Sequence, residues 1–376
     1  MISISSASPT PPNSPLIGPT IKRIIAGGSS YNDGDEEYDN TAVWQFKADG
    51  SIFKKLLDYP ALNMPDVSED SAVSPVDSSI YCGYWNSTDL KGEVHKFDEN
   101  GNPVLTWGDN GVIQYPYGSA AVKSVSVDSS GNLYVGIYHH PSEPPHKIFY
   151  KYNSNGNLIW SNLLSSQSRW ISHIMFASDG VGYLVEYDAN TAPWWHARKF
   201  NKDTGALGIM YSAALAIRPY GMDVDDFGYV YVTNGWSLER SANDGILQNM
   251  VMIDENPPIE GHAESLIVKS GLSEEATIVY AGGYKRNGGT GENENNIWKY
   301  DYDFGNLLAT KLFSTSYSAN ANRVSQDDDD KIFVLYGTPA TKNIFQLDCS
   351  DLSITKTITL PEYLGFDYVV RQNVST

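Results

Sequence analysis

The chain has 376 residues, of which 41% are hydrophobic, and its formal net charge at pH 7 is −19. Its 26 lysine and arginine residues against 45 aspartate and glutamate residues leave no basic face for phosphate contacts, so we expect no nucleic-acid partner. No stretch approaches the length of an apolar membrane-spanning helix. Two cysteines far apart in sequence give neither a disulfide framework nor a zinc spacing.

The first twenty residues, 1–20, are rich in serine and proline and lack the basic start and apolar core of a secretory signal. Such a composition predicts an extended tether that cannot bury enough apolar area to fold alone. We expect this tether to attach the protein to a partner protein in an assembly, and residues 21–376 to form a single domain.

From Thr41 to Leu360 a two-strand pattern recurs seven times, about every fifty residues. Each copy has two strands of alternating polarity around a tight turn built on Asp, Asn or Gly. The copies begin near residues 42, 94, 148, 196, 248, 296 and 343. A second hairpin lies between successive copies, and Ser124–Gly136 is its clearest example. Two hairpins in this spacing are typical of one four-stranded blade of a β-propeller.

The two ends of the chain supply the strands that the repeats leave out. Ile21–Gly27 has the pattern of a lone second strand, and Phe366–Val370 has that of a lone first strand. Pairing these two segments would complete a blade and leave no exposed edge. The sequence therefore predicts an all-β fold, a seven-bladed β-propeller of four-stranded antiparallel blades closed by its N- and C-terminal strands.

Two motifs carry a resemblance to known repeats. Tyr231–Asn234 has the sequence YVTN, and Asp128–Val135 has the related form D-x-x-G-N-x-Y-V. Nearly the whole chain resembles the tandem-repeat propellers of the broad YVTN, NHL and quinoprotein-like group. That group contains enzymes, scaffolds and surface-binding proteins, so the resemblance implies a fold and no single chemistry. The tether and the aromatic loops also look similar to propeller components of phage particles.

We expect function on one face of the propeller. The residues of the short turns, such as Asp49-Gly50 and Asn155-Gly156, have a structural role, because tight turns need residues that accept positive φ. The connections on the opposite face are long and aromatic, and exposed Trp and Tyr suit binding to sugars or to a protein partner. The predicted ligand-binding residues are Tyr31, Trp85, Tyr187, Trp194, Trp195, Trp236 and Tyr284. The alternative is that these rings pack between blades.

Two clusters in the same loops have metal-binding side chains. His139, His140 and His146 could ligate a transition metal, although their spacing fits no established motif. The acidic run that includes Asp33, Asp35 and Glu36 could bind calcium, but it lacks the ligand order of an EF-hand, which favours a solvated cluster. We therefore expect no cofactor and no metal, with calcium as the alternative.

These observations lead to a non-catalytic binding or structural module, associated with a virion or an extracellular surface, that binds a partner protein or host glycan. A cytoplasmic location is the alternative. No catalytic residue is assigned, because the nucleophile sequence G-x-S-x-G does not occur. The vicinal cysteine pair of many quinoprotein dehydrogenases is also absent. The alternative function is a propeller enzyme, lactonase- or lyase-type or quinoprotein-like, with its site at the central channel.

Overall fold

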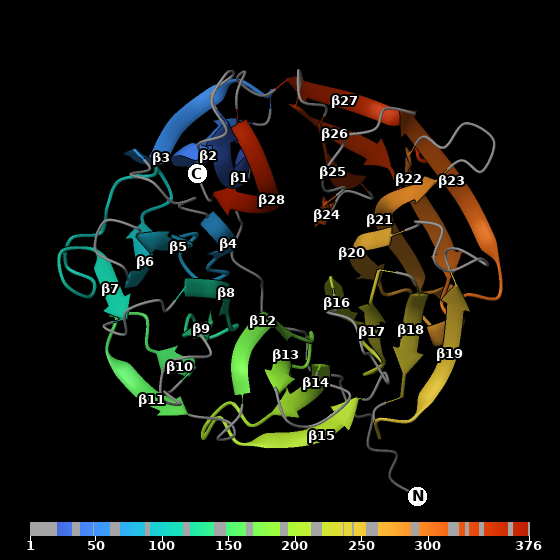
Figure 1. Cartoon of the computed structure of the whole chain (residues 1–376), viewed down its shortest axis with the longest axis horizontal. Helices are drawn as coiled ribbons and strands as arrows, with labels where there is room; N and C mark the ends of the chain where they lie inside the picture. Colours follow the sequence, from blue (N-terminus) through green and yellow to red (C-terminus); the bar gives the residue numbers. More distant parts are fainter. Residues whose placement is uncertain are drawn as a thin grey trace, which may run out of the picture.

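The computed structural model describes the chain from residue 21 to residue 374 with gaps. The described ranges are 21–31, 38–47, 49–60, 68–86, 91–115, 121–138, 148–162, 168–188, 195–211, 220–235, 237–242, 244–252, 262–286, 293–314, 323–327, 331–337, 342–359 and 364–374. Within these ranges the fold is all-β apart from one turn of 3-10 helix, η1 (Glu274–Ala276). Small antiparallel sheets surround a central axis, the arrangement of a β-propeller (Figure 1).

Five of the sheets have four strands each, and their innermost strand is named first. The first sheet contains β28 (Leu364–Val374), β1 (Ile21–Tyr31), β2 (Tyr38–Lys47) and β3 (Ile52–Pro60). The second contains β4 (Ser68–Val73), β5 (Ile80–Asn86), β6 (Lys91–Phe97) and β7 (Val112–Tyr115). The third contains β16 (Gly221–Val224), β17 (Val230–Thr233), β18 (Ser237–Ser241) and β19 (Leu247–Met252). The fourth contains β20 (His262–Lys269), β21 (Ile278–Arg286), β22 (Asn293–Asp301) and β23 (Leu307–Ser314). The fifth contains β24 (Arg323–Asp327), β25 (Lys331–Gly337), β26 (Lys342–Asp348) and β27 (Ile354–Thr359).

The remaining eight strands form one continuous sheet. One half contains β8 (Ala121–Val127), β9 (Leu133–Tyr138), β10 (Phe149–Tyr152) and β11 (Leu158–Asn162). The other half contains β12 (Ser168–Phe176), β13 (Gly182–Asp188), β14 (Trp195–Phe200) and β15 (Leu207–Tyr211). The halves are joined by a single pair of residues, Trp170 of β12 and Tyr138 of β9.

The predicted pairing of the two terminal strands is present. β1 runs antiparallel to β28, with Ile25 opposite Val370 and Gly27 opposite Tyr368. The inner neighbour of β1, the first described strand, is therefore β28, the last described strand. Residues 1–20, with their predicted role as a tether, lie outside the described residues.

Tight turns in the repeats are held by aspartate side chains. Asp128 Oδ1 accepts the backbone N–H groups of Ser130 and Asn132 at 2.9 Å each, and the Tyr134 hydroxyl donates to Oδ2 at 3.1 Å. Asp225 repeats the arrangement in the next but one hairpin of this kind, with the Tyr231 hydroxyl at 3.1 Å. The shared pattern D-x-x-G-x-x-Y therefore specifies a turn, which explains why it occurs in both hairpins.

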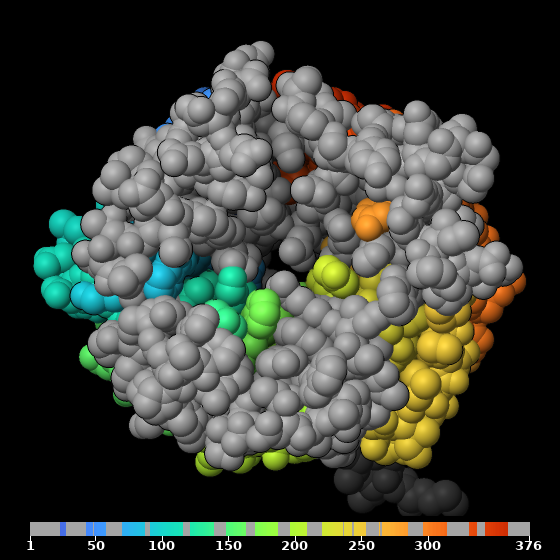
Figure 2. Space-filling view, viewed as in Figure 1, coloured from blue at the N-terminus to red at the C-terminus, as the bar shows by residue number. Residues whose placement is uncertain are grey.

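The connections lie on two opposite faces because consecutive strands are antiparallel. We call the turn face the one with the turns between first and second and between third and fourth strands of each sheet. The loop face carries the connections between second and third strands and between successive sheets. Figure 2 views the molecule along the same direction as Figure 1, onto the loop face.

On the turn face, long side chains of third strands cross to the neighbouring repeat. Lys96 and Lys299 each donate from Nζ to a backbone carbonyl in the outer turn of the next sheet, at 3.1 Å (Ser154) and 2.8 Å (Cys349). Gln45 does the same to the Glu99 carbonyl at 3.0 Å. Lys151 makes the same contact between the two halves of the eight-stranded sheet, to the Lys202 carbonyl at 2.9 Å. These contacts, here named carbonyl clasps, tie neighbouring repeats together while satisfying carbonyls that the turns leave unpaired.

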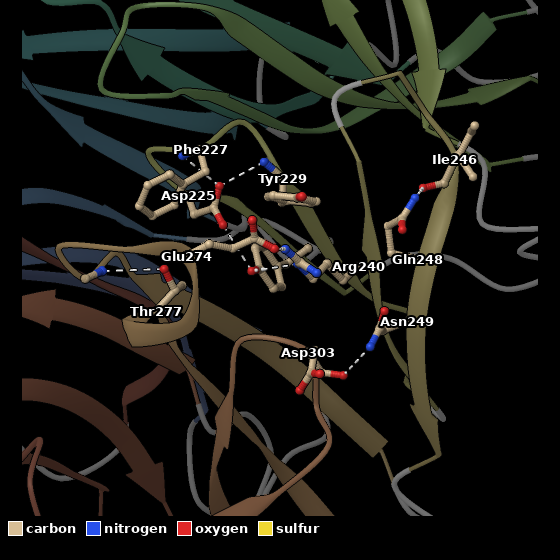
Figure 3. Close-up of polar contacts among 12 residues, drawn as sticks. Asp225, Phe227, Tyr229, Arg240, Ile246, Gln248, Asn249, Glu274, Thr277 and Asp303 are labelled. Carbon is tan, nitrogen blue, oxygen red and sulfur yellow. Dashed lines mark hydrogen bonds and ion pairs between the residues drawn. The ribbon is translucent and has the colours of Figure 1, made fainter.

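In β18 an arginine occupies the position of the clasping lysines (Figure 3). Arg240 Nε donates to the Tyr231 hydroxyl at 3.1 Å, its guanidinium stacks 3.5 Å from the Tyr229 ring centroid, and it forms an ion pair with Glu274 of the next sheet. The outer-turn carbonyl, that of Asp303, is bonded instead by Asn249 at 2.8 Å.

One repeat departs from the predicted pattern. After the Asn100-Gly101 turn the fourth strand was expected at once, but β7 begins only at Val112. The intervening segment turns at Gly108 and Gly111, both with positive φ, and places Trp107 in the core at 1% exposure. Trp107 packs edge-on against Tyr81, with ring centroids 5.5 Å apart. Burial of this indole stabilises the longer connection.

Candidate functional site

Three glutamates are buried at the loop-face ends of three different sheets. Glu93 on β6, Glu186 on β13 and Glu239 on β18 have exposures of 3%, 1% and 6%. Burying a carboxylate is costly unless it is paired, so the partners of each side chain show what role it can take.

Glu93 is fully bonded. Its Oε2 lies 2.9 Å from His95 Nε2, and its Oε1 accepts the side-chain amides of Asn86 at 3.1 Å and Gln114 at 2.8 Å. Burial by itself raises the pKa of Glu93, but the hydrogen bond and charge of His95 and the two amides outweigh it, so the pKa lies below its ordinary value. With both oxygens occupied, this carboxylate is suited to holding the sheet ends together.

Glu186 is neutralised by a cation. Arg198 Nε lies 2.5 Å from its Oε1, and the two residues sit on neighbouring strands β13 and β14. His196, which is opposite Glu186 in the register, is also buried at 2% exposure. Arg198 is half-buried, and its positive charge favours the ionised form of the buried Glu186 carboxylate.

Glu239 differs from both. Its Oε1 accepts Asn234 Nδ2 and Ser237 Oγ, each at 3.1 Å. Its Oε2 is buried and has no hydrogen-bond partner among the described residues. Burial raises the pKa of Glu239, and the Ser237 hydroxyl opposes the rise only in part. This carboxyl group is oriented through one oxygen, while the other is buried and unpaired, here called open because no described residue forms a hydrogen bond with it. With a raised pKa, such a group is suited to accept and return a proton.

The predicted aromatic residues are only partly within the described chain. Trp85 and Tyr284 are half-buried near the loop-face ends of β5 and β21. Tyr31, Tyr187 and Trp195 lie at loop-face ends of β1, β13 and β14, and Tyr187 is opposite Trp195 in the register. Trp194 and Trp236 lie outside the described residues, so a site made of all seven stays a prediction.

The predicted metal-binding clusters also fall outside the described ranges, both the histidines His139, His140 and His146 and the acidic residues Asp33, Asp35 and Glu36. Within the described ranges, no three His, Cys, Asp or Glu side chains are grouped in a way that could hold a metal ion. Cys82 and Cys349 are buried thiols, and burial raises the pKa of Cys82 to about 12.

Sequence reasoning missed the three buried glutamates. The available signal was a charged residue inside a strand whose neighbours are apolar or aromatic, as in Gly182–Asp188. Glu239 has no such signal, because Arg240 and two serines share its five-residue strand. An acidic side chain in a buried strand position needs a partner, and that need marks it for attention.

No protein-family model matches the sequence. No curated protein matches it by sequence either. Solved structures, however, resemble the chain over most of its length. The periplasmic gluconolactonase PpgL of Pseudomonas aeruginosa is 14% identical, with a TM-score of 0.59 over 94% of this chain and 99% of that one. A putative 6-phosphogluconolactonase of Bacteroides fragilis is 15% identical, with a TM-score of 0.54 over 97% and 99%.

A third structure, of a protein from Lactobacillus plantarum, is 13% identical, with a TM-score of 0.58 over 94% of this chain and 100% of the other. At sequence identities this low, the structural likeness establishes the shared propeller fold and nothing more. The interpretation as a non-catalytic binding module was wrong, because propellers named as lactonases match the chain from end to end. They favour the enzyme alternative, and nothing in the comparisons supports a phage or virion origin. No helix in the described ranges is long and apolar enough to cross a membrane.

Proposed function

We propose that the protein is a seven-bladed propeller enzyme of the lactonase type, acting on a sugar lactone at its loop face. The blade count follows if the eight-stranded sheet is two blades joined at the Trp170–Tyr138 bridge. The described strands then divide into seven sets of four, and the pairing of β1 with β28 closes the ring. Closure of this kind leaves no exposed edge.

The observation that carries the enzymatic proposal is the open oxygen of Glu239. Lactone hydrolysis needs a group that takes a proton from water and returns it to the leaving oxygen. In the proposed reaction Glu239 Oε2 accepts the proton as the water oxygen bonds to the lactone carbonyl carbon. The ring C–O bond then breaks, and the ring oxygen takes the proton from Glu239, giving one hydroxy acid.

Asn234 and Ser237 have a positioning role in this scheme. Both donate to Oε1 of Glu239 at 3.1 Å, so the open Oε2 has a fixed direction. Preorganised geometry of this kind lowers the cost of reaching the transition state. Glu93, with a hydrogen-bond partner on each oxygen, lacks a comparable open position.

Further features of the loop face suit a sugar substrate. The half-buried rings of Trp85 and Tyr284 offer apolar surface with polar edges, which can contact the faces of a sugar ring. We also propose a periplasmic or extracellular location, supported by the fold that the chain shares with the periplasmic gluconolactonase.

The test is hydrolysis of glucono-1,5-lactone followed in a pH-stat, with the uncatalysed rate subtracted. Glu239→Gln should lower kcat by about 100-fold or more, the usual size of a general-base contribution. Glu93→Gln is the matched control and should retain wild-type kcat. Thermal unfolding of both variants checks that they fold. Wild-type turnover in a folded Glu239→Gln variant would remove Glu239 from the reaction, and no turnover of any sugar lactone by the wild type would end the proposal.

A further inference from the structure

A cation is held against aromatic rings where the two halves of the eight-stranded sheet meet. Lys123 Nζ lies 5.6 Å from the ring centroid of Trp170, within the range of a cation–π contact. The Tyr138 ring packs edge-on against Trp170 with centroids 5.1 Å apart. All three side chains are half-buried, so each keeps part of its surface accessible.

These residues lie close to the central axis on the loop face. Lys123 and Trp170 are each the third residue of an innermost strand, β8 and β12, at the end where the long connections enter. Figure 1 shows both strands beside the central opening. In the space-filling view, described residues of these strands, coloured teal and green, reach the surface beside a central depression (Figure 2).

Backbone pairing joins the two halves of the sheet at this group. Trp170 and Tyr138 are also the residues through which β12 pairs with β9, the pairing that makes the eight-stranded sheet continuous. A ligand contacting Lys123 therefore meets side chains whose backbones are already ordered. Preorganisation of this kind reduces the entropy lost on binding.

The charge of the whole chain makes the position of Lys123 significant. With a net charge of −19 the protein repels small anions from most of its surface. An anion approaching the centre of the loop face needs a local cation. The Lys123 ammonium, which contacts the Trp170 ring beside the central opening, supplies that positive charge.

We infer that Lys123, Trp170 and Tyr138 form a subsite for a small sugar carboxylate at the centre of the loop face. The ammonium pairs with the carboxylate, and the exposed parts of the two rings contact the sugar chain. The choice of an aldonate, the hydroxy acid released from a sugar lactone, rests on the proposed function. The site itself does not, because binding requires no turnover.

The experiment measures binding of gluconate to the folded full-length protein by titration calorimetry. Glucose, acetate and inorganic phosphate are the comparison probes. Gluconate should bind most tightly, and more weakly as salt is raised, since charge attraction is screened. Lys123→Gln should raise the gluconate Kd by about tenfold, the effect of losing one charge-assisted contact.

Lys55→Gln is the matched control. Lys55 is also half-buried and lies 5.1 Å from the ring centroid of Trp44, but it belongs to the outer strand β3. Its gluconate Kd should equal that of the wild type. Lactone hydrolysis by the wild type is measured in parallel, so gluconate binding without turnover would support this inference and reject only the proposed reaction.

Three results would overturn the inference. The first is a Lys123→Gln variant that binds gluconate as the wild type does. The second is equal affinity for gluconate and glucose, which would remove the role of charge. The third is tighter binding of phosphate or acetate than of gluconate, which would exclude a sugar carboxylate as the preferred ligand. Activity without gluconate binding would leave the proposed function standing and reject only the subsite.

Discussion

The turn face and the loop face use polar side chains in opposite ways. On the turn face, Lys96, Lys151 and Lys299 occupy the same position in three of the repeats, and each bonds a carbonyl in the outer turn of the following repeat. On the loop face, the buried carboxylates of Glu93, Glu186 and Glu239 have three different sets of partners, and one oxygen remains open. Regular positions of the repeats thus hold neighbouring repeats together, whereas irregular positions form the candidate site.

The largest expected effect concerns the scaffold as a whole. Removing residues 365–376 takes away nearly all of β28 and leaves β1 with an exposed edge in the innermost position of its sheet. We expect the melting temperature to fall by at least about 5 °C or refolding to fail, since a loss of about 4 kcal/mol shifts a chain of this size by that amount. Circular dichroism melts measure it. Removing residues 1–19 is the control, and a truncated chain that melts with the wild type would contradict the role of β28.

The next effect tests the seam between the halves of the eight-stranded sheet. A Cβ atom added to Gly136 would lie 2.6 Å from Ile171 Cγ2, so Gly136→Ala should destabilise by about 1 to 3 kcal/mol. Gly208 on β15 has only ordinary contacts at 3.4 Å and beyond, so Gly208→Ala should be close to neutral. Urea unfolding of the two variants compares them directly. Equal midpoints would show that the sheets do not approach closely at Gly136.

A smaller effect separates the two faces. Lys299→Met removes the donor to the carbonyls of Cys349 and Ser350 while keeping much of the side-chain volume. The unfolding free energy should fall by only about 0.5 to 1.5 kcal/mol. The Cys349 carbonyl still accepts the Tyr280 hydroxyl at 3.0 Å, and the contact to Ser350 is exposed to solvent. Lactone hydrolysis should be unchanged. A loss of activity larger than the loss of stability would show that the turn face takes part in function.

The smallest effect is a pH dependence on the loop face. Burial raises the pKa of Glu239 above its ordinary value, so the folded protein binds this proton more tightly than the unfolded chain. Its contribution to stability is therefore present at low pH and is lost as pH rises through the folded-state pKa. Glu239→Gln should flatten this part of the profile. Unfolding free energies between pH 4 and pH 8 test it, and parallel wild-type and variant profiles would place the carboxyl in a solvated site.

Much of the fold was predictable because it depends on local patterns. Strand alternation and turn residues such as Asp128 and Asp225 act within a few neighbouring positions, so the seven recurring hairpins and the pairing of the chain ends could be predicted. The longer connection that contains Trp107 could not be predicted, since its stability comes from a contact with Tyr81 on another strand.

The candidate site was far less predictable than the fold. What distinguishes Glu239 from Glu93 is the number of donors that tertiary structure brings to each oxygen, and that number is not a property of strand pattern. The prediction of a non-catalytic protein failed for a related reason. Repeats record how the chain folds, and they carry no information on which side chain keeps an open oxygen.

The pairing of β1 with β28 also has a consequence for biosynthesis. Residues 21–31 leave the ribosome first among the described strands, yet their inner neighbour is made of residues 364–374. Through most of translation β1 therefore presents an unpaired edge, and contacts so distant in sequence form slowly. A nascent chain in that state is exposed to edge-to-edge association with other chains. The last eleven-residue strand is the segment whose arrival ends that exposure.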